Sequence, residues 1–425
     1  MAASTLSEKQ RIRILDKVSE VVTRKFYDPE FHQIDWLAAV GKHRKDIMAA
    51  PSDEAFEIAI TKLLSELKSS HVGFYHVGLA RATSKMAICA TYAAFPFEDE
   101  ERWVFQDVHE GGPAAKAGIK SGDILISVEG RSFCPPEHPT FSMGKTVAVK
   151  VLTSGLQEQD RMVVIPTPKR KFNQLPYIQP EPVVSHRRLN RETGYIKIAM
   201  YPGAVGVEVA NSISDAVRSL DPIERLIIDL RGNTGGGIGV LRVMSLLTPK
   251  QLPVGTFLNG KLVQTSDSKN KPLVFDRIPS RKLGLLPILL RFVGLSLIRK
   301  AIGRKTPIAV MTEGSEVQSF QGRVVLLVDR HTASANEMLI AFARENKLVT
   351  IVGEATPGRV LGGNKFKMPH GYWLALPVGA YRTTRGDGIE GKSIAPDMLE
   401  PFDPEAARAG RDTQLERAIE VVSRL

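Results

Sequence analysis

The chain has 425 residues, of which 43% are hydrophobic and 24% are charged, and its formal net charge is +11. This length and composition are ordinary for a globular protein of two or three domains with a large buried core. The basic residues are scattered and form no basic helix interleaved with aromatic side chains, so nucleic-acid binding is not predicted. The two cysteines, Cys89 and Cys134, give neither a disulfide framework nor a metal-ligand spacing. We therefore expect no metal and no other cofactor.

The N-terminal residues have no apolar core of the kind found in signal peptides, and we expect a cytoplasmic protein. The longest apolar run, at 283–298, is short for a membrane span and carries Pro287 and Arg291. We interpret residues 283–300 as a buried or interfacial insert. Together with the basic residues that follow it, the stretch 283–305 predicts at most a weak contact with a membrane surface.

Residues 1–80 are predicted to form a helical domain. Apolar residues at helical spacing predict helices over 7–26 and 35–50, and Ser52 is the expected N-cap of a third helix over 53–67. Ser70 and His71 follow in the loop after that helix. A lone histidine in such a loop is commonly a structural residue, and this interpretation stays open from the loop alone.

Residues 81–165 are predicted to form a second domain, in which alternating apolar residues predict strands over 86–95 and 103–108. The segment 111–130, GGPAAKAGIKSGDILISVEG, combines a short capped helix, a turn, a strand and a tight turn. This pattern resembles a PDZ domain of the bacterial type. PDZ domains bind extended chain ends by strand addition. The resemblance implies a peptide-binding loop at Lys85, Met86, Ala87 and Ile88, although this loop lacks the usual glycines.

Residues 166–190 are rich in proline and charge and are predicted to be a linker, and residues 191–425 to be an α/β domain. A strand at 194–200, a helix at 207–220 and a strand at 225–230 alternate, which indicates a layered α/β core. The glycine loop RGNTGGG follows at 231–237. It lacks the residues of a phosphate-binding loop, so the alternative is that backbone N–H groups of Gly235 or Gly236 face a developing oxyanion.

The stretch 324–337, VVLLVDRHTASANE, predicts a buried strand, a polar turn and a helix. Ser334 stands between Ala333 and Ala335 at the strand-to-helix turn. A serine there has an exposed hydroxyl beside the first free N–H groups of the helix, as a nucleophile requires. On this segment alone, a plain helix cap is the commoner role for such a serine.

Three further stretches complete the pattern: a loop at 353–363 (GEATPGRVLGG), a segment at 388–397 (GIEGKSIAPD) and a closing helix over 411–425. In this order, the stretches resemble the serine peptidase family of C-terminal processing peptidases and the tricorn core protease. The resemblance implies a crotonase/ClpP-like layered catalytic core and a homo-oligomer. It also implies hydrolysis of peptide bonds, through an acyl-enzyme intermediate, in unfolded or C-terminal segments of a polypeptide substrate.

The resemblance also assigns catalytic roles. Processing peptidases use a serine and a lysine, but the position of that lysine is occupied by Arg359, whose guanidinium stays protonated and cannot act as a base. The tricorn-like set fits instead: the nucleophile Ser334, the base His71, the orienting carboxylate Glu390 and the intervening hydroxyl of Ser70. Glu390 as a plain turn residue stays open. The oxyanion hole is assigned to Ala335 with Gly235, which we prefer slightly, or Gly236.

A second hypothesis is a catalytically inactive PDZ scaffold that binds peptides without cutting them. Arg359, at the position of the family lysine, favours this alternative.

Overall fold

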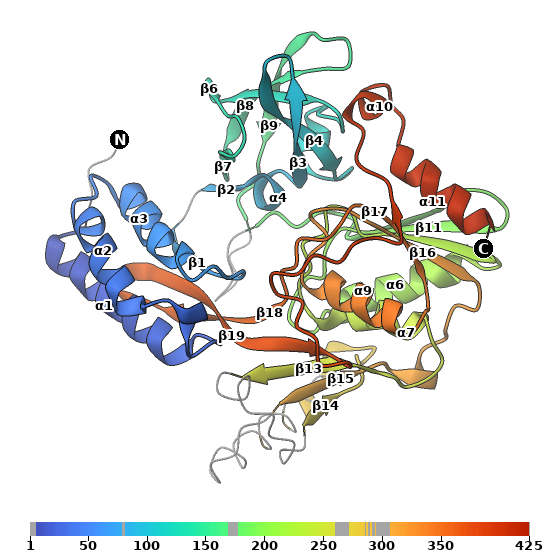
Figure 1. Cartoon of the computed structure of the whole chain (residues 1–425). Coiled ribbons are helices and arrows are strands. Elements are labelled where there is room, and N and C mark those ends of the chain that lie inside the picture. The colour runs from blue at the N-terminus through green and yellow to red at the C-terminus, as the bar shows by residue number, and fades with distance from the viewer. Residues whose placement is uncertain are drawn as a thin grey trace.

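The computed structural model of the chain describes residues 6–78, 81–168, 177–259, 272–284, 286–287, 290, 294 and 307–424. Figure 1 shows a group of N-terminal helices on the left, a small antiparallel sheet at the top and a larger α/β part on the right. Several sheets combine with helices, as expected for a mixed α/β protein. Most of the apolar insert 283–300, and part of the predicted linker, lie outside the described residues.

The N-terminal helices form where their caps and apolar spacing predict them. They are α1 (Glu8–Lys25), α2 (Trp36–Met48) and α3 (Asp53–Ser65), and each begins with a side-chain oxygen that accepts a backbone N–H of its first turn. Their apolar stripes pack against β18 (Leu361–Lys367) and β19 (Tyr372–Thr383). The helices therefore share one core with strands from the C-terminal half of the chain, because each stripe needs an apolar cover.

The second group of elements is an antiparallel sheet with the strand order β3-β4-β5-β8-β9. The prediction of a strand from Met86 is wrong at its beginning, because residues 84–87 form the short helix α4. The buried hydroxyl of Ser84 donates to the Ala90 carbonyl oxygen (2.9 Å), which closes the turn before the first strand. The elements of this group are β2 (Arg81–Thr83), α4 (Ser84–Ala87), β3 (Ala90–Phe97), β4 (Glu100–Val108), α5 (Pro113–Lys116), β5 (Ile124–Val128), β6 (Arg131–Ser132), β7 (Thr140–Ser142), β8 (Thr146–Leu152) and β9 (Glu158–Val164).

The largest α/β layer is a sheet with the strand order β10-β11-β12-β16-β17-β20, parallel except for β10. Strand β10 lies within the predicted linker 166–190 but pairs with β11, so this part of the prediction is wrong. Leu226 packs on the helices of one face, whereas its neighbour Ile227 packs against α11 on the other. The elements are β10 (Val184–Arg188), β11 (Thr193–Ile198), α6 (Val207–Leu220), β12 (Arg225–Asp229), η2 (Ile238–Val240), α7 (Leu241–Leu246), β16 (Arg323–Val328), α9 (Ala335–Glu345), β17 (Thr350–Gly353), β20 (Met398–Leu399), α10 (Pro404–Arg408) and α11 (Thr413–Arg424).

A third sheet connects the helical part to the α/β part. Its long strand β19 pairs with β1 at residues 372–375 and with β13 at residues 379–383. The loop that carries His71 is thereby brought close to the α/β layer. The remaining elements are η1 (Phe31–Gln33), β1 (Gly73–His76), β13 (Pro253–Asn259), β14 (Leu273–Phe275), η4 (Lys282–Gly284), β15 (Ile308–Met311), η5 (Gly314–Glu316) and η6 (Pro369–Gly371).

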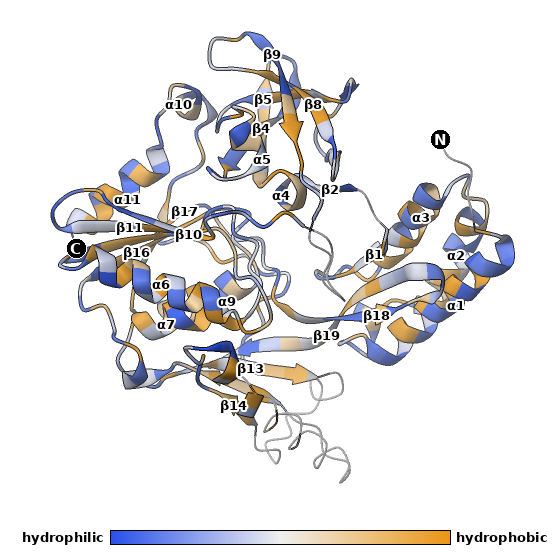
Figure 2. Cartoon of the chain, turned by 180° about the vertical axis from the view of Figure 1, so that it is seen from behind, coloured by the Kyte–Doolittle hydropathy of each residue, from blue (hydrophilic) through white to orange (hydrophobic). Residues whose placement is uncertain are grey.

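The interior strands are the most apolar part of the fold, and β16 is mainly orange between helices in Figure 2. All five residues Val324–Val328 are buried, as the continuous apolar run predicts for a strand covered on both faces. Of the helices that the structure describes, none is long and apolar enough to cross a lipid bilayer.

Candidate active site

Ser334 lies at the sharp turn between β16 and α9. Its backbone has φ 58° and ψ −113°, a strained conformation for a residue other than glycine. Its N–H donates to Glu337 Oε2 (3.0 Å), and its hydroxyl lies 3.4 Å from His71 Nε2. A serine that only caps a helix has extended backbone angles. The turn therefore presents the Ser334 hydroxyl to a ring nitrogen of His71, while the residue also stands at the N-cap of α9.

The four predicted catalytic side chains form one hydrogen-bonded series. The Ser70 hydroxyl donates to Glu390 Oε2 (2.8 Å) and lies 2.7 Å from His71 Nδ1. Because that hydroxyl has one hydrogen, and the carboxylate takes it, Nδ1 must carry the proton that joins His71 to Ser70. The other ring nitrogen, Nε2, then presents a lone pair towards Ser334.

Glu390 is fixed by backbone groups as well as by the serine. Its Oε1 accepts the Ser70 N–H (2.8 Å), and its Oε2 also accepts the Val360 N–H (3.0 Å). The loops that carry Val360 and Glu390 are joined by a bond from the Gly391 N–H to the Gly358 carbonyl oxygen (2.8 Å). A carboxylate held by three donors is not a free turn residue.

Desolvation lowers the pKa of His71. The Glu390 charge opposes this shift, and the Arg359 charge adds to it. The residue itself is exposed to solvent. A lowered pKa keeps the imidazole neutral at physiological pH, the form that can accept a proton from a hydroxyl.

The glycine loop lies directly against the nucleophile. A Cβ added to Gly235 would be 2.8 Å from the Ser334 Cβ and 3.0 Å from the Ala335 nitrogen. The Gly235 N–H already donates to Asn233 Oδ1 (2.9 Å). Among the described residues, the N–H groups of Gly236 and Ala335 have no hydrogen-bond acceptor. The geometry thus does not support our preference for Gly235 as the oxyanion donor, because its N–H is engaged elsewhere.

Glu337 was missed by the sequence reasoning. This fully buried carboxylate accepts the Ser334 N–H, the Thr356 hydroxyl (2.7 Å), the Gly358 N–H (2.6 Å) and the Arg359 N–H (2.8 Å). It joins the nucleophile turn to the loop beside Glu390. The S-x-x-E spacing of Ser334 and Glu337 is the capping-box pattern. This pattern could have predicted from the sequence that Glu337 contacts the Ser334 turn.

Asn233 and Asn336, both fully buried, were also missed. The Asn336 side chain donates to the Asn233 carbonyl oxygen (2.7 Å), which also accepts the Ala333 N–H (3.1 Å). These bonds attach the glycine loop to the nucleophile turn. Nothing in the two local sequences indicates this pairing.

A buried ionic cluster joins the glycine loop to the antiparallel sheet β3-β4-β5-β8-β9. Lys197 of β11 donates to Asp107 of β4 (2.7 Å) and to the Arg231 carbonyl oxygen (2.8 Å). Burial by itself would raise the pKa of Asp229, but the charges of Arg231 and Lys197 hold that pKa far below its ordinary value. The sheet also touches the nucleophile turn, because His331 Nε2 lies 2.7 Å from the Tyr92 carbonyl oxygen.

The four residues expected to bind peptide belong to α4 and the residue after it. Ala87 and Ile88 are fully buried, and the Ile88 N–H donates to the Ser84 carbonyl oxygen (2.8 Å). The Met86 carbonyl oxygen accepts the Ile178 N–H (2.7 Å), and the buried Lys85 ammonium has no hydrogen-bond partner in the described structure. Peptide binding by this loop stays a prediction. Across the described residues, no group of three His, Cys, Asp or Glu side chains could hold a metal ion.

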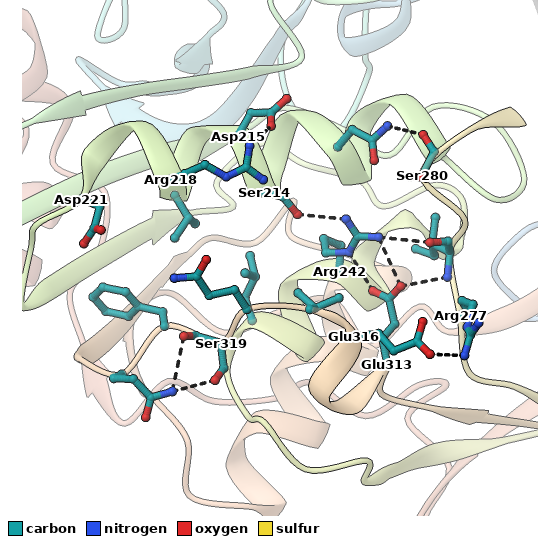
Figure 3. Close-up of a pocket in the computed structure, with 18 of the residues that line it drawn as sticks. Ser214, Asp215, Arg218, Asp221, Arg242, Arg277, Ser280, Glu313, Glu316 and Ser319 are labelled. Carbon is teal, nitrogen blue, oxygen red and sulfur yellow. Dashed lines mark hydrogen bonds and ion pairs between the residues drawn. The ribbon is translucent and has the colours of Figure 1, made fainter.

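A cavity of about 910 Å³ lies elsewhere in the α/β part, and none of the predicted catalytic residues lines it (Figure 3). The buried Arg242 of this cavity is paired with Glu313 (2.7 Å) and donates to Ser214 (2.9 Å). These contacts satisfy the guanidinium within the protein, so this charge is not free to bind a ligand in the cavity.

Two parts of the chain match known families: residues 192–399 match peptidase family S41, and residues 104–140 match the PDZ domain. Tricorn protease homolog 2 of Streptomyces coelicolor is 23% identical over 96% of this chain and 32% of its own length. The chloroplastic C-terminal processing peptidase of Tetradesmus obliquus is 23% identical over 90% of this chain and 75% of its own length. The chain therefore spans about a third of the first relative and three quarters of the second.

Two solved structures share the fold along 98% of both chains. They are a photosystem II D1 C-terminal processing protease (TM-score 0.57, 18% identity) and mature CPAF complexed with lactacystin (TM-score 0.61, 15% identity). The family matches, the relatives and the shared fold agree with one another. The comparisons therefore identify residues 192–399 as similar to peptidase family S41 and residues 104–140 as similar to the PDZ domain.

Proposed function

We propose that the protein is a serine endopeptidase that cleaves polypeptides through an acyl-enzyme intermediate formed on Ser334. The observation that carries this proposal is the hydrogen-bond series Glu390, Ser70, His71, Ser334. Its direction, set by the single hydrogen of the Ser70 hydroxyl, gives the imidazole a free lone pair on the side of Ser334. This is the protonation state in which a histidine activates a serine.

In the acylation step, Ser334 Oγ attacks the substrate carbonyl carbon while His71 Nε2 takes the hydroxyl proton. His71, now protonated on both nitrogens, donates the Nε2 proton to the leaving amine. Water enters in place of the amine and is activated by the same nitrogen to release the acyl group. Glu390, acting through Ser70, stabilises the positive imidazolium and fixes the orientation of its ring.

The negative charge of the tetrahedral intermediate requires donors beside Ser334. We assign this role to the N–H groups of Gly236 and Ala335, which have no acceptor in the described structure. Gly235 keeps the loop close to the serine and leaves no room for a side chain. Loss of one such donor lowers kcat about 10²–10³-fold in serine peptidases.

Several expectations from the sequence belong to this proposal. The substrates are unfolded or C-terminal polypeptide segments, the layering of the core is crotonase/ClpP-like, and the active form is a homo-oligomer. The cytoplasmic location and a weak membrane contact through 283–305 stay predictions. The alternative of a silent PDZ scaffold has no support from the relatives named above, all of which are proteases or peptidases by name.

Covalent labelling with a fluorophosphonate probe tests the proposal, because the probe reacts only with an activated serine. We expect stoichiometric labelling on Ser334 and cleavage of an unfolded protein such as reduced casein. Both should disappear in Ser334→Ala and persist in Ser423→Ala, which removes an exposed hydroxyl from α11. Cleavage that survives Ser334→Ala would contradict the assignment.

A further inference from the structure

Two cations on segments next to His71, Arg359 and Lys365, have no acidic partner among the described residues. Arg359 is exposed and Lys365 is half-buried. Among the described residues, neither side chain makes an ion pair or a side-chain hydrogen bond. Two arginines of the α/β part differ: Arg231 is paired with Asp412, and Arg330 is paired with Glu354. A cation that stays unpaired beside a catalytic residue is available to a ligand.

The backbone of Arg359 is held next to the nucleophile. Its N–H and the Ser334 N–H donate to the same oxygen of Glu337, over 2.8 and 3.0 Å. The backbone nitrogens of Arg359 and Ser334 are therefore close neighbours, because each lies one hydrogen bond away from the same oxygen. The next N–H, of Val360, donates to Glu390 (3.0 Å). Arg359 is thus fixed between the two carboxylates that organise the site, and only its side chain is free.

Lys365 lies on strand β18, two residues after the glycine of that strand that faces His71. A Cβ at Gly363 would lie 3.8 Å from the His71 Cβ, so this face of the strand is directed at the imidazole. Lys365 is two residues farther along a regular part of the strand and shares that face. Desolvation lowers the pKa of Lys365, and no neighbouring carboxylate opposes the shift.

The nearest acidic groups are unavailable to these cations. Glu337 already accepts four hydrogen bonds and Glu390 accepts three. The positive charge of the Arg359 guanidinium acts on the imidazole, since it lowers the pKa of His71. An extended peptide brings only neutral amides to such a cleft, so a negative charge must come from an acidic side chain or a C-terminal carboxylate.

We propose that Arg359 and Lys365 form a carboxylate-binding part of the substrate cleft, which makes the peptidase select substrates with a carboxylate close to the scissile bond. This inference rests on the proposed function, since it names the substrate class of the same site. Arg359, at the position of the family lysine, then serves in substrate recognition. Its planar guanidinium suits bidentate contact with a carboxylate.

Matched internally quenched peptides test the proposal. One series carries Glu or Gln at each position on both sides of the scissile bond, with capped ends. A second series is Gln-only and ends either in a free carboxylate or in an amide close to the cleaved bond. The ratio of kcat/KM between acidic and neutral peptides is measured for the wild type, Arg359→Gln, Arg359→Lys, Lys365→Gln and Lys347→Gln. Lys347→Gln is the matched control, because it removes an exposed cation just after the C-terminal end of α9.

In the wild type, kcat/KM should be about ten- to hundredfold higher for one acidic series than for its neutral counterpart. This is the effect expected from one hydrogen bond between charged groups. The series that shows the preference distinguishes side-chain from C-terminal carboxylates. Arg359→Gln should remove most of the ratio, Lys365→Gln part of it, and Arg359→Lys should restore part of it, whereas Lys347→Gln should match the wild type. The ratio should also fall as salt increases.

Equal kcat/KM for acidic and neutral peptides, in an enzyme that cleaves both and labels with fluorophosphonate, would overturn this inference and leave the proposed function intact. An unchanged ratio of kcat/KM between acidic and neutral peptides in both Arg359→Gln and Lys365→Gln would also overturn this inference. Absence of both cleavage and labelling would instead contradict the proposed function, and this inference with it. Thermal unfolding of each variant identifies a failure to fold, and Arg359→Lys then supplies the readout.

Discussion

Glu390 reaches His71 through the hydroxyl group of Ser70, which donates to the carboxylate (2.8 Å) and lies 2.7 Å from the imidazole Nδ1. The serine thus occupies the place at which a carboxylate usually contacts the histidine directly. It transmits the orientation of the carboxylate but carries no charge of its own. The interaction that stabilises the imidazolium is therefore divided between a hydrogen bond and a more distant charge.

Replacing Ser70 by alanine removes this link. We expect Ser70→Ala to lower kcat/KM about ten- to hundredfold, because one hydrogen bond to a group that becomes charged is lost. KM should change less than kcat. The adjacent Ser69→Ala removes a hydroxyl that makes a longer 3.4 Å bond to the Ser70 carbonyl oxygen, and it serves as the control. Equal activity of both variants would show that Ser70 plays no part in catalysis.

The pH dependence of labelling should report His71. Only the neutral imidazole accepts the serine proton, so the labelling rate should rise with pH through the pKa of His71. Desolvation and the Arg359 charge place that pKa below the ordinary value of about 6.5. Arg359→Gln removes a positive charge that disfavours the imidazolium, so it should raise the midpoint of the rate profile. A wild-type midpoint above 7, or a downward shift in the variant, would contradict this account.

Glu337 should be essential for the geometry of the nucleophile turn. In Glu337→Gln, one of the two acceptor oxygens becomes an NH₂ group that faces N–H donors. We expect the free energy of unfolding to fall by about 1.5–3 kcal/mol for each lost bond to the carboxylate, and labelling of Ser334 to slow. Urea denaturation and labelling kinetics measure the two effects. Glu345→Gln, at the other end of α9, is the control and should change neither by a comparable amount.

Lys197 should hold the PDZ domain against the catalytic core. Lys197→Met leaves the carboxylate of Asp107 and part of Asp229 buried without their cation, which costs about 3–5 kcal/mol for a broken buried pair. Hydrogen exchange should increase in β4 and β11 together. Lys150→Met removes a surface lysine paired with Glu158 and Asp160 and should cost less than about 1 kcal/mol. A similar small effect for both variants would mean that the buried pair does not join the two parts.

Much of the local structure could be predicted from the sequence. The helix over 207–220 has the predicted bounds, and Ser52 caps α3 as expected. The PDZ segment, the glycine loop and the turn at Ser334 also appear where their motifs place them. These features depend on residues within a few positions of one another: on apolar spacing, caps and turn residues.

The errors have a different origin. Residues 84–87 form a helix because the buried Ser84 hydroxyl bonds a carbonyl oxygen beyond the turn, and β10 is a strand because the edge of β11 offers it a partner. In both cases the observed local structure supplies hydrogen-bond partners to backbone groups of the surrounding fold that would otherwise have none. Composition alone gives no sign of such a partner.

The sequence by itself determined which side chains are candidates for catalysis and which short elements carry them. Only the tertiary structure decided that they meet, since Ser334 and His71 are 263 positions apart and Glu390 and Ser70 are 320 apart. It also decided that the Gly235 N–H is engaged by Asn233, and that Glu337 joins the nucleophile turn to Arg359. The physical reason is that these residues are brought together by strand pairing around β19 and by buried polar groups that must find partners across the fold. Neither of these is encoded in the neighbouring residues.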